Sequence, residues 1–132
     1  MEIKVSSEQG RIPVTVLHVK GDLDMATSEQ VLAQARQAFD AGARNMVLDL
    51  AEVPYMSSAG LRALHSVFEM LRSDSPAEGN EAMRKGLADG TFKSPHFKLV
   101  NPSRRVQEVL SMSGFDMFLE THRNVKDAVA SF

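Results

Sequence analysis

The sequence predicts an α/β domain with a parallel-rich mixed sheet of four to five strands and about four helices. Short runs rich in Val, Ile and Leu alternate with segments whose apolar residues recur every three or four positions. The first pattern is typical of buried strands and the second of amphipathic helices. Because strand and helix alternate, most strands are expected to lie parallel, joined by crossover helices. The chain has 132 residues, a length that fits one domain over residues 1–132.

The first part of the chain is predicted to form two strands and a helix. Residues 3–5 alternate between apolar and polar side chains, as in a short edge strand, and residues 14–19 are β-branched and largely apolar, as in a buried strand. Thr27 and Gln30 have the spacing of a capping box, so a helix is expected to begin at Thr27. Gly42 stands where a glycine commonly ends a helix.

The middle of the chain is predicted to form a strand, a helix and then an insertion. Residues 46–50 are an apolar run typical of a buried strand, and a helix is expected from Ser58. The polar stretch at about residues 73–95 contains several Gly and Pro and is longer than a usual connection. In the helix expected from Ser58, the apolar face consists of Leu61, Leu64, Phe68 and Leu71.

The last part of the chain is predicted to contain two short strands, each followed by a helix. Residues 97–100 form the first strand, after which Asn101 is expected to cap a helix that has Pro102 in its first position. Residues 117–120 are predicted to form the last strand. Asn124 is expected to cap the final helix.

Composition excludes several classes of protein. The chain has no Cys, which rules out disulfides and thiolate metal sites. Its 15 basic and 17 acidic residues show no clustered basic excess, so no nucleic-acid partner is expected. No apolar run approaches the roughly 20 residues of a membrane span, and the N-terminus lacks the pattern of a secretory leader. These features together predict a cytoplasmic protein.

A serine hydrolase is not predicted. Ser57 and Ser58 stand where the strand at 46–50 turns into the next helix, but the motif is SSAG and not the G-x-S-x-G elbow. His65 is about two helical turns from Ser58, or about 10 Å along the axis, too far for a direct hydrogen bond. No other His stands out as a base, so no catalytic residue is assigned.

Metal and nucleotide sites have little support. The four His are dispersed, and neither a P-loop nor a G-x-G-x-x-G motif is present. Asp22, Asp24 and Asp49 could converge at the carboxyl ends of strands and bind Mg²⁺. Such residues more often form turns and caps, and Asp49 is expected to accept hydrogen bonds from the backbone of the following turn. No metal or cofactor is therefore predicted.

Several segments resemble one family. Residues 47–61, VLDLAEVPYMSSAGL, resemble the signature of anti-sigma factor antagonists, which form the STAS domain class (sulfate transporter and anti-sigma factor antagonist). GDLD at 21–24 resembles the family's G-x-L-D turn after its second strand, and LVNPS at 99–103 resembles its fourth strand and following helix start. The resemblance covers most of the chain and implies a single STAS-type domain with an inserted segment at about 73–95.

The resemblance implies a non-enzymatic switch in the bacterial cytoplasm. An unphosphorylated antagonist binds an anti-sigma factor that is also a serine kinase, and thereby frees a sigma factor to regulate transcription. The kinase uses ATP to phosphorylate the antagonist, and a PP2C-type phosphatase reverses the reaction. Carried over, the phosphoacceptor is Ser58. Ser57, which stands where the family usually has Asp, is the second choice.

The partner-binding surface is expected around the same turn. A phosphate would suit the positive end of the helix, but a partner packed over it would have to desolvate that charge. Arg62, four residues after Ser58, could meet the phosphate or a partner carboxylate, or be an ordinary exposed helix arginine. An alternative function is a STAS scaffold or accessory subunit of a stress-signalling or transport assembly, without serine phosphorylation; the oligomeric state stays open. The predicted partner-binding residues are Asp22, Asp24, Ser57, Ser58, Ala59, Gly60 and Arg62.

Overall fold

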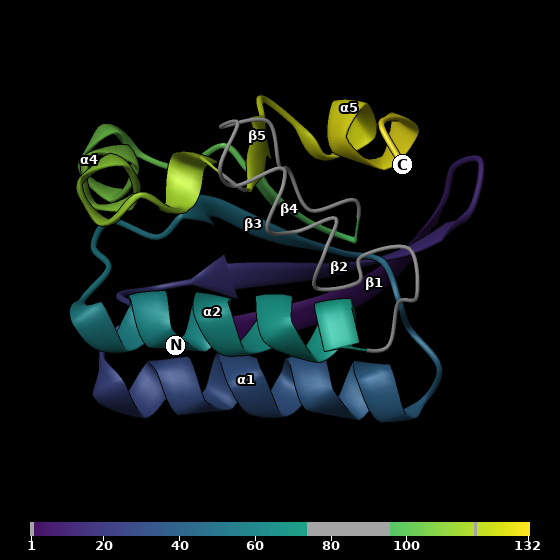
Figure 1. Cartoon of the computed structure of the whole chain (residues 1–132), viewed down its shortest axis with the longest axis horizontal. Helices are drawn as coiled ribbons and strands as arrows, with labels where there is room; N and C mark the ends of the chain where they lie inside the picture. The colour runs from purple at the N-terminus through teal and green to yellow at the C-terminus, as the bar shows by residue number, and fades with distance from the viewer. Residues whose placement is uncertain (1, 74–95, 118) are drawn as a thin grey trace.

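The computed structural model describes residues 2–73, 96–117 and 119–132 (Figure 1). Strands and helices alternate along most of this part of the chain. In order, the elements are β1 (Glu2–Gln9), β2 (Pro13–Lys20), α1 (Met25–Asp40), β3 (Met46–Glu52), α2 (Ser58–Ser73), β4 (Phe97–Val100), α4 (Arg104–Ser113), the 3₁₀ helix η2 (Phe115–Met117), β5 (Glu120–His122) and α5 (Val125–Ala130).

The strands form one five-stranded sheet in the order β1-β2-β3-β4-β5. β1 runs antiparallel to β2, and each of the other neighbouring pairs is parallel. Leu17, Leu48 and Leu99 lie side by side across the three central strands. This register confirms the predicted parallel-rich mixed sheet and brings the carboxyl ends of β2 and β3 together.

Helices cover both faces of the sheet (Figure 1). α1 and α2 lie side by side against one face, and α5 packs on the other. The larger apolar core lies between the sheet and α1 and α2, and Val106 and Leu110 of α4 join it. The smaller core joins Ala128 and Val129 of α5 to valines of the sheet. The larger core holds α1 and α2 as a fixed pair beside the candidate site.

The start of α1 differs from the prediction. Asp24, not Thr27, is the N-cap, and Thr27 is the third helical residue. The Asp24 carboxylate accepts from the Thr27 N–H at 3.0 Å, while the Thr27 hydroxyl oxygen accepts from the Asp24 N–H at 2.9 Å. The pair is a reciprocal capping box displaced by three residues. Asp24 is the N-cap because Leu23, just before it, forms a parallel bridge with Met56 and is therefore held in an extended conformation.

Two predictions near the C-terminus were also wrong. α4 begins at Arg104 after the N-cap Ser103, whose hydroxyl accepts from the Val106 N–H at 3.2 Å. Asn101, the predicted cap, instead has a φ of +52°, a left-handed conformation that Asn tolerates better than most residues. The strand predicted at 117–120 is replaced by η2 and by β5, which starts at Glu120. The predicted cap at Asn124 is confirmed.

Part of the sequence prediction falls outside the described residues. The insertion expected at about 73–95 lies there except for Ser73, the last residue of α2. Within residues 2–73, 96–117 and 119–132, no helix combines the length and the apolar character needed to cross a membrane.

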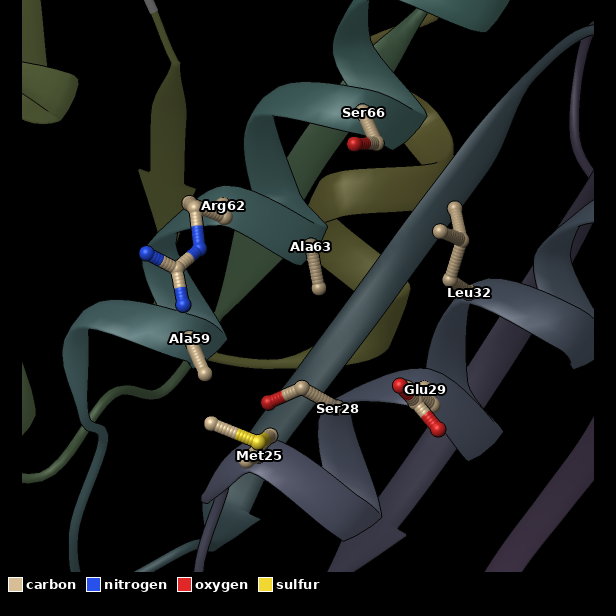
Figure 2. A pocket seen from close by; sticks show the side chains of 8 residues that line it. All are labelled: Met25, Ser28, Glu29, Leu32, Ala59, Arg62, Ala63 and Ser66. Atoms are coloured by element: carbon tan, nitrogen blue, oxygen red, sulfur yellow. The ribbon is translucent and has the colours of Figure 1, made fainter.

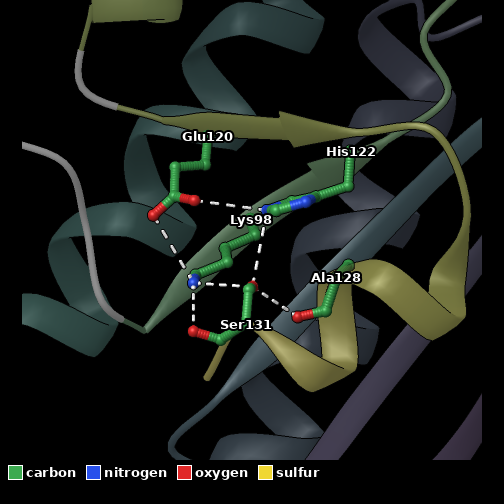
Figure 3. Close-up of polar contacts among 5 residues, drawn as sticks. All are labelled: Lys98, Glu120, His122, Ala128 and Ser131. Atoms are coloured by element: carbon green, nitrogen blue, oxygen red, sulfur yellow. Dashed lines mark hydrogen bonds and ion pairs between the residues drawn. The ribbon is translucent and has the colours of Figure 1, made fainter.

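A buried lysine fastens α5 to the sheet (Figure 3). Lys98 of β4 is 3 % exposed, and its Nζ donates to the Ser131 hydroxyl at 2.8 Å and to the Ser131 carbonyl at 3.1 Å. The Glu120 carboxylate lies 3.5 Å from the same Nζ, and His122 lies 3.3 Å from Glu120. The Nζ also lies 4.6 Å from the centre of the Phe132 ring. These contacts compensate the buried ammonium for its lost hydration, and they hold Ser131 and Phe132, which follow α5, against the sheet.

We expect the Lys98→Met variant to lose about 1–2 kcal/mol of unfolding free energy, because the methylene stem stays while the hydrogen bonds to Ser131 disappear. The loss stays moderate since Glu120 is 37 % exposed and keeps His122 as a partner. Urea denaturation measures the free energy, and hydrogen exchange should speed up in α5. Lys126→Met, on the exposed side of α5, is the matched control. Unchanged exchange in α5 would contradict the fastening role.

Candidate functional site

Two loops meet at the carboxyl end of the sheet. The β2–α1 loop pairs with the β3–α2 loop through Leu23, whose N–H donates to the Tyr55 carbonyl at 2.9 Å. The Leu23 carbonyl accepts from the Ser57 N–H at 2.9 Å, and Leu23 forms a parallel bridge with Met56. Leu23 and Met56 are each 1 % exposed. The loops are therefore a short, buried extension of the parallel sheet, not free segments.

This pairing places the predicted site residues of both loops at one edge. Asp22 and Asp24 flank buried Leu23 and are exposed, and Ser58 is exposed at the first position of α2. The hydrogen bond from the Thr27 N–H is the main cause that lowers the pKa of the Asp24 carboxyl. Asp24 is consequently ionised at neutral pH and committed to capping α1.

The two serines of the turn have different surroundings. The Ser57 hydroxyl is half-buried and donates to the Leu23 carbonyl at 3.0 Å. Its own carbonyl accepts from the Leu61 N–H at 3.2 Å, which starts the helical hydrogen bonds of α2. An ionised Asp at position 57 has no proton to donate to Leu23, so Ser makes a contact that Asp cannot. Ser58, in contrast, presents its side chain to solvent.

The remaining predicted residues lie on the first two turns of α2. Gly60 is buried against the paired loops, where an added Cβ would lie 2.6 Å from Met56 Cγ and 3.1 Å from Leu23 Cβ. Only glycine lets the helix approach this closely. Ala59 is half-buried and Arg62 is exposed. Arg62 forms no ion pair with any described residue.

A groove between α1 and α2 adds residues that the sequence did not single out (Figure 2). Its cavity measures about 170 Å³ and is lined on α2 from Ala59, the residue that follows Ser58. Small side chains at facing positions leave this space between the two helices. Ser28 lies at the floor of the groove, and it was not identified from the sequence because no local pattern tells which helices will face each other. We call this the α1–α2 groove; it is lined by Met25, Ser28, Glu29, Leu32, Ala59, Arg62, Ala63 and Ser66.

A separate polar trio lies across the first three strands. Ser6 Oγ is 3.1 Å from His18 Nε2, and His18 Nδ1 is 2.9 Å from Asp49 Oδ2. The other Asp49 oxygen accepts from the Ala51 N–H at 3.1 Å, which confirms the expected structural contact of Asp49 with the backbone that follows it. The trio resembles a serine-hydrolase relay in its order of atoms, but here it joins neighbouring strands, and each polar group has its partner.

The three aspartates do not form a metal site. Asp49 is bound to His18, Asp24 caps α1, and Asp22 is exposed in the loop. In the part of the chain that the structure describes, no group of three His, Cys, Asp or Glu side chains is placed to hold a metal ion.

Comparison with known proteins agrees with this geometry. The STAS domain family matches residues 5–75, which include both paired loops and all of α2. The chain belongs to the STAS domain family. BtrV of Bordetella bronchiseptica, which carries the name of an anti-sigma factor antagonist, is 30 % identical over 114 residues, or 86 % of this chain and 82 % of BtrV. The resemblance found in the motifs is thus confirmed.

Solved structures of STAS proteins have the same fold. A STAS domain protein of Planctomyces limnophilus superposes with a TM-score of 0.69 at 19 % identity, covering 96 % of this chain and 93 % of that one. Unphosphorylated SpoIIAA gives 0.65 at 20 % identity over 96 % and 93 % of the chains. SpoIIAA of Bacillus in its phosphorylated form gives 0.62 at 18 % identity over 97 % and 96 %. At these identities the likeness concerns the fold.

Proposed function

We propose that this STAS protein is an anti-sigma factor antagonist whose binding is switched off by phosphorylation of Ser58. The non-enzymatic switch acts in the bacterial cytoplasm: the unphosphorylated form sequesters an anti-sigma factor that is also a serine kinase, and a PP2C-type phosphatase restores it. The likeness to BtrV and to SpoIIAA supports the class of partner. The assignment of Ser58 as the phosphoacceptor rests on one observation: Ser58 is exposed at the first position of a well-packed helix.

The surroundings of the turn favour Ser58 over Ser57. A phosphate on Ser57 would break the hydrogen bond to the Leu23 carbonyl and crowd a half-buried position. A phosphate on Ser58 would stand in solvent near the first N–H groups of α2, which have no carbonyl acceptor within the helix. The helix dipole favours that charge by about 0.3–1 kcal/mol, so the fold should tolerate the modification. The change is then confined to the surface that a partner covers.

Phosphosite mapping tests the proposal. Candidate anti-sigma factor kinases of the source organism are each incubated with ATP and the protein, and the phosphorylated residue is identified by tandem mass spectrometry. We expect phosphate on Ser58, none in the Ser58→Ala variant, and continued phosphorylation of the Ser57→Ala control. An unmodified protein would instead favour the alternative function, a STAS scaffold or accessory subunit without serine phosphorylation, for which Ser57 in place of Asp is the motivating observation.

A further inference from the structure

Ser28 is the unusual residue of the α1–α2 groove. Its side chain is 4 % exposed, and its Oγ has no hydrogen-bond partner among the described residues. A helical serine commonly donates its hydroxyl to the carbonyl four residues earlier, but here the Asp24 carbonyl accepts the Ser28 N–H, at 2.9 Å, and not the Ser28 hydroxyl. Buried hydroxyls are rarely left unpaired, because the loss of water is then not compensated. The Ser28 hydroxyl can therefore donate a hydrogen bond to an acceptor that a ligand or a partner supplies.

The groove places a second donor near the first. Figure 2 shows the Arg62 guanidinium on the α2 side beside Ala59, and the Ser28 oxygen pointing between Met25 and Ala59. Glu29 stands on the α1 side and forms no ion pair with Arg62 in the described structure. Among the described residues both charges are therefore unpaired, but the Ser28 oxygen points to the side of the groove that carries Arg62 and away from Glu29, which favours an anionic occupant there.

The size of the groove suits one side chain of a partner. A cavity of about 170 Å³ is close to the size that holds a single ring such as benzene. Its walls include Leu32 and Ala63, which suit a methylene stem. Met25 is 69 % exposed, and a flexible methionine can move aside to uncover the Ser28 hydroxyl.

We propose that the α1–α2 groove seats an acidic side chain of the anti-sigma factor, whose carboxylate accepts from the Ser28 hydroxyl and from Arg62. This inference rests on the proposed function and specifies the chemistry of its partner. It also gives phosphorylation a second route of action. Ser58 and Arg62 are four residues apart and therefore on the same helix face. A phosphate on Ser58 recruits the Arg62 guanidinium, since Arg–phosphate pairs are strong and often bidentate, and removes it from the groove.

Ser28→Ala gives the sharpest test, because stability and binding should change in different directions. Removing an unpaired buried hydroxyl should leave the melting temperature unchanged or raise it. Calorimetric titration with the purified anti-sigma factor that binds the unchanged protein should nevertheless show about tenfold weaker binding, as expected for a lost hydrogen bond to a charged group. Ser111→Ala, which removes an exposed hydroxyl from α4 outside the groove, should bind as the unchanged protein does. Wild-type affinity in Ser28→Ala would overturn the proposal.

Arg62→Gln tests the charge. We expect about tenfold or greater loss of affinity, whereas Arg36→Gln on the exposed side of α1 should have no effect. Pairing Arg62→Gln with Glu→Gln or Asp→Gln replacements in the partner should reveal one partner acid whose effect is not additive. Additive effects at every partner acid would overturn the assignment of an acidic occupant. If the unchanged protein does not bind at all, the proposed function fails together with this inference.

A third measurement needs no partner. Phosphoserine is introduced at position 58 during translation, and the second pKa of the phosphate is followed by ³¹P NMR. Contact with Arg62 should give a lower phosphate pKa in the otherwise unchanged protein than in Arg62→Gln, because a nearby cation favours the doubly charged form. Equal pKa values in the two proteins would overturn the capture of Arg62 by the phosphate.

Discussion

The Ser58→Asp substitution is expected to weaken binding to the anti-sigma factor by at least about a hundredfold. The carboxylate stands on the exposed first residue of α2, where a docked partner must strip it of water, and pairing with Arg62 would relieve it only by withdrawing that guanidinium from the partner. A buried, unpaired charge in an interface costs about 2–5 kcal/mol, and each 1.4 kcal/mol is about a tenfold change in affinity. The melting temperature should change little, because the helix dipole favours a negative charge at this end. Calorimetric titration and thermal denaturation measure the two quantities.

Two controls separate charge from bulk and from position. Ser58→Asn has nearly the shape of Ser58→Asp without its charge and should lose much less affinity. Ser7→Asp places the same charge on an exposed serine of β1, paired with Thr15 at the opposite end of β2 from the candidate site. It should bind as the unchanged protein does. Binding of Ser58→Asp at the unchanged affinity would contradict the switch.

The order of the elements could be predicted because each strand and helix carries its own pattern. The apolar run of β3 and the repeat of leucines in α2 are local features, so α2 was expected from Ser58, where it begins. The predicted start of a helix was wrong where two side chains could both serve as its N-cap. Asp24 and Thr27 have suitable oxygens, and the choice depends on the pairing of Leu23 with Met56, which lie far apart in sequence.

The candidate site likewise contains residues that a local motif predicts and residues whose roles depend on contacts between distant segments. Ser58 and Gly60 belong to one continuous motif, and the structure places both at the turn where the motif led us to expect them. The role of Ser28 depends on how α1 faces α2, and nothing in either helix alone encodes that contact. The hydrogen bond from Ser57 to Leu23 likewise joins two loops, so the sequence could show that Ser57 departs from the family's usual Asp but not how Ser fits there.

Replacement of Gly60 should destabilise the fold in proportion to the size of the new side chain. An added Cβ would lie 2.6 Å from Met56 Cγ, 3.1 Å from Leu23 Cβ and 3.3 Å from the Leu23 carbonyl oxygen. Ala is a better helix former than Gly by about 0.5–1 kcal/mol, so propensity alone would predict stabilisation. Overpacking a buried contact costs about 1–3 kcal/mol. We expect sterics to win, with a net loss of about 1–2 kcal/mol for Gly60→Ala and about 3 kcal/mol for Gly60→Val.

The steric term should win because the neighbours of Gly60 cannot retreat. Leu23 is fixed by hydrogen bonds to Tyr55 and Ser57, and Met56 is 1 % exposed. Relief therefore requires α2 to move away from the paired loops, which would also displace Ser58. Urea denaturation measures the loss, with Ala59→Val as a control that places its methyl groups toward the α1–α2 groove and should cost no more than the propensity difference of about 0.7 kcal/mol. A Gly60→Ala protein as stable as the unchanged one would show that the loops yield, and that the site is less rigid than its contacts imply.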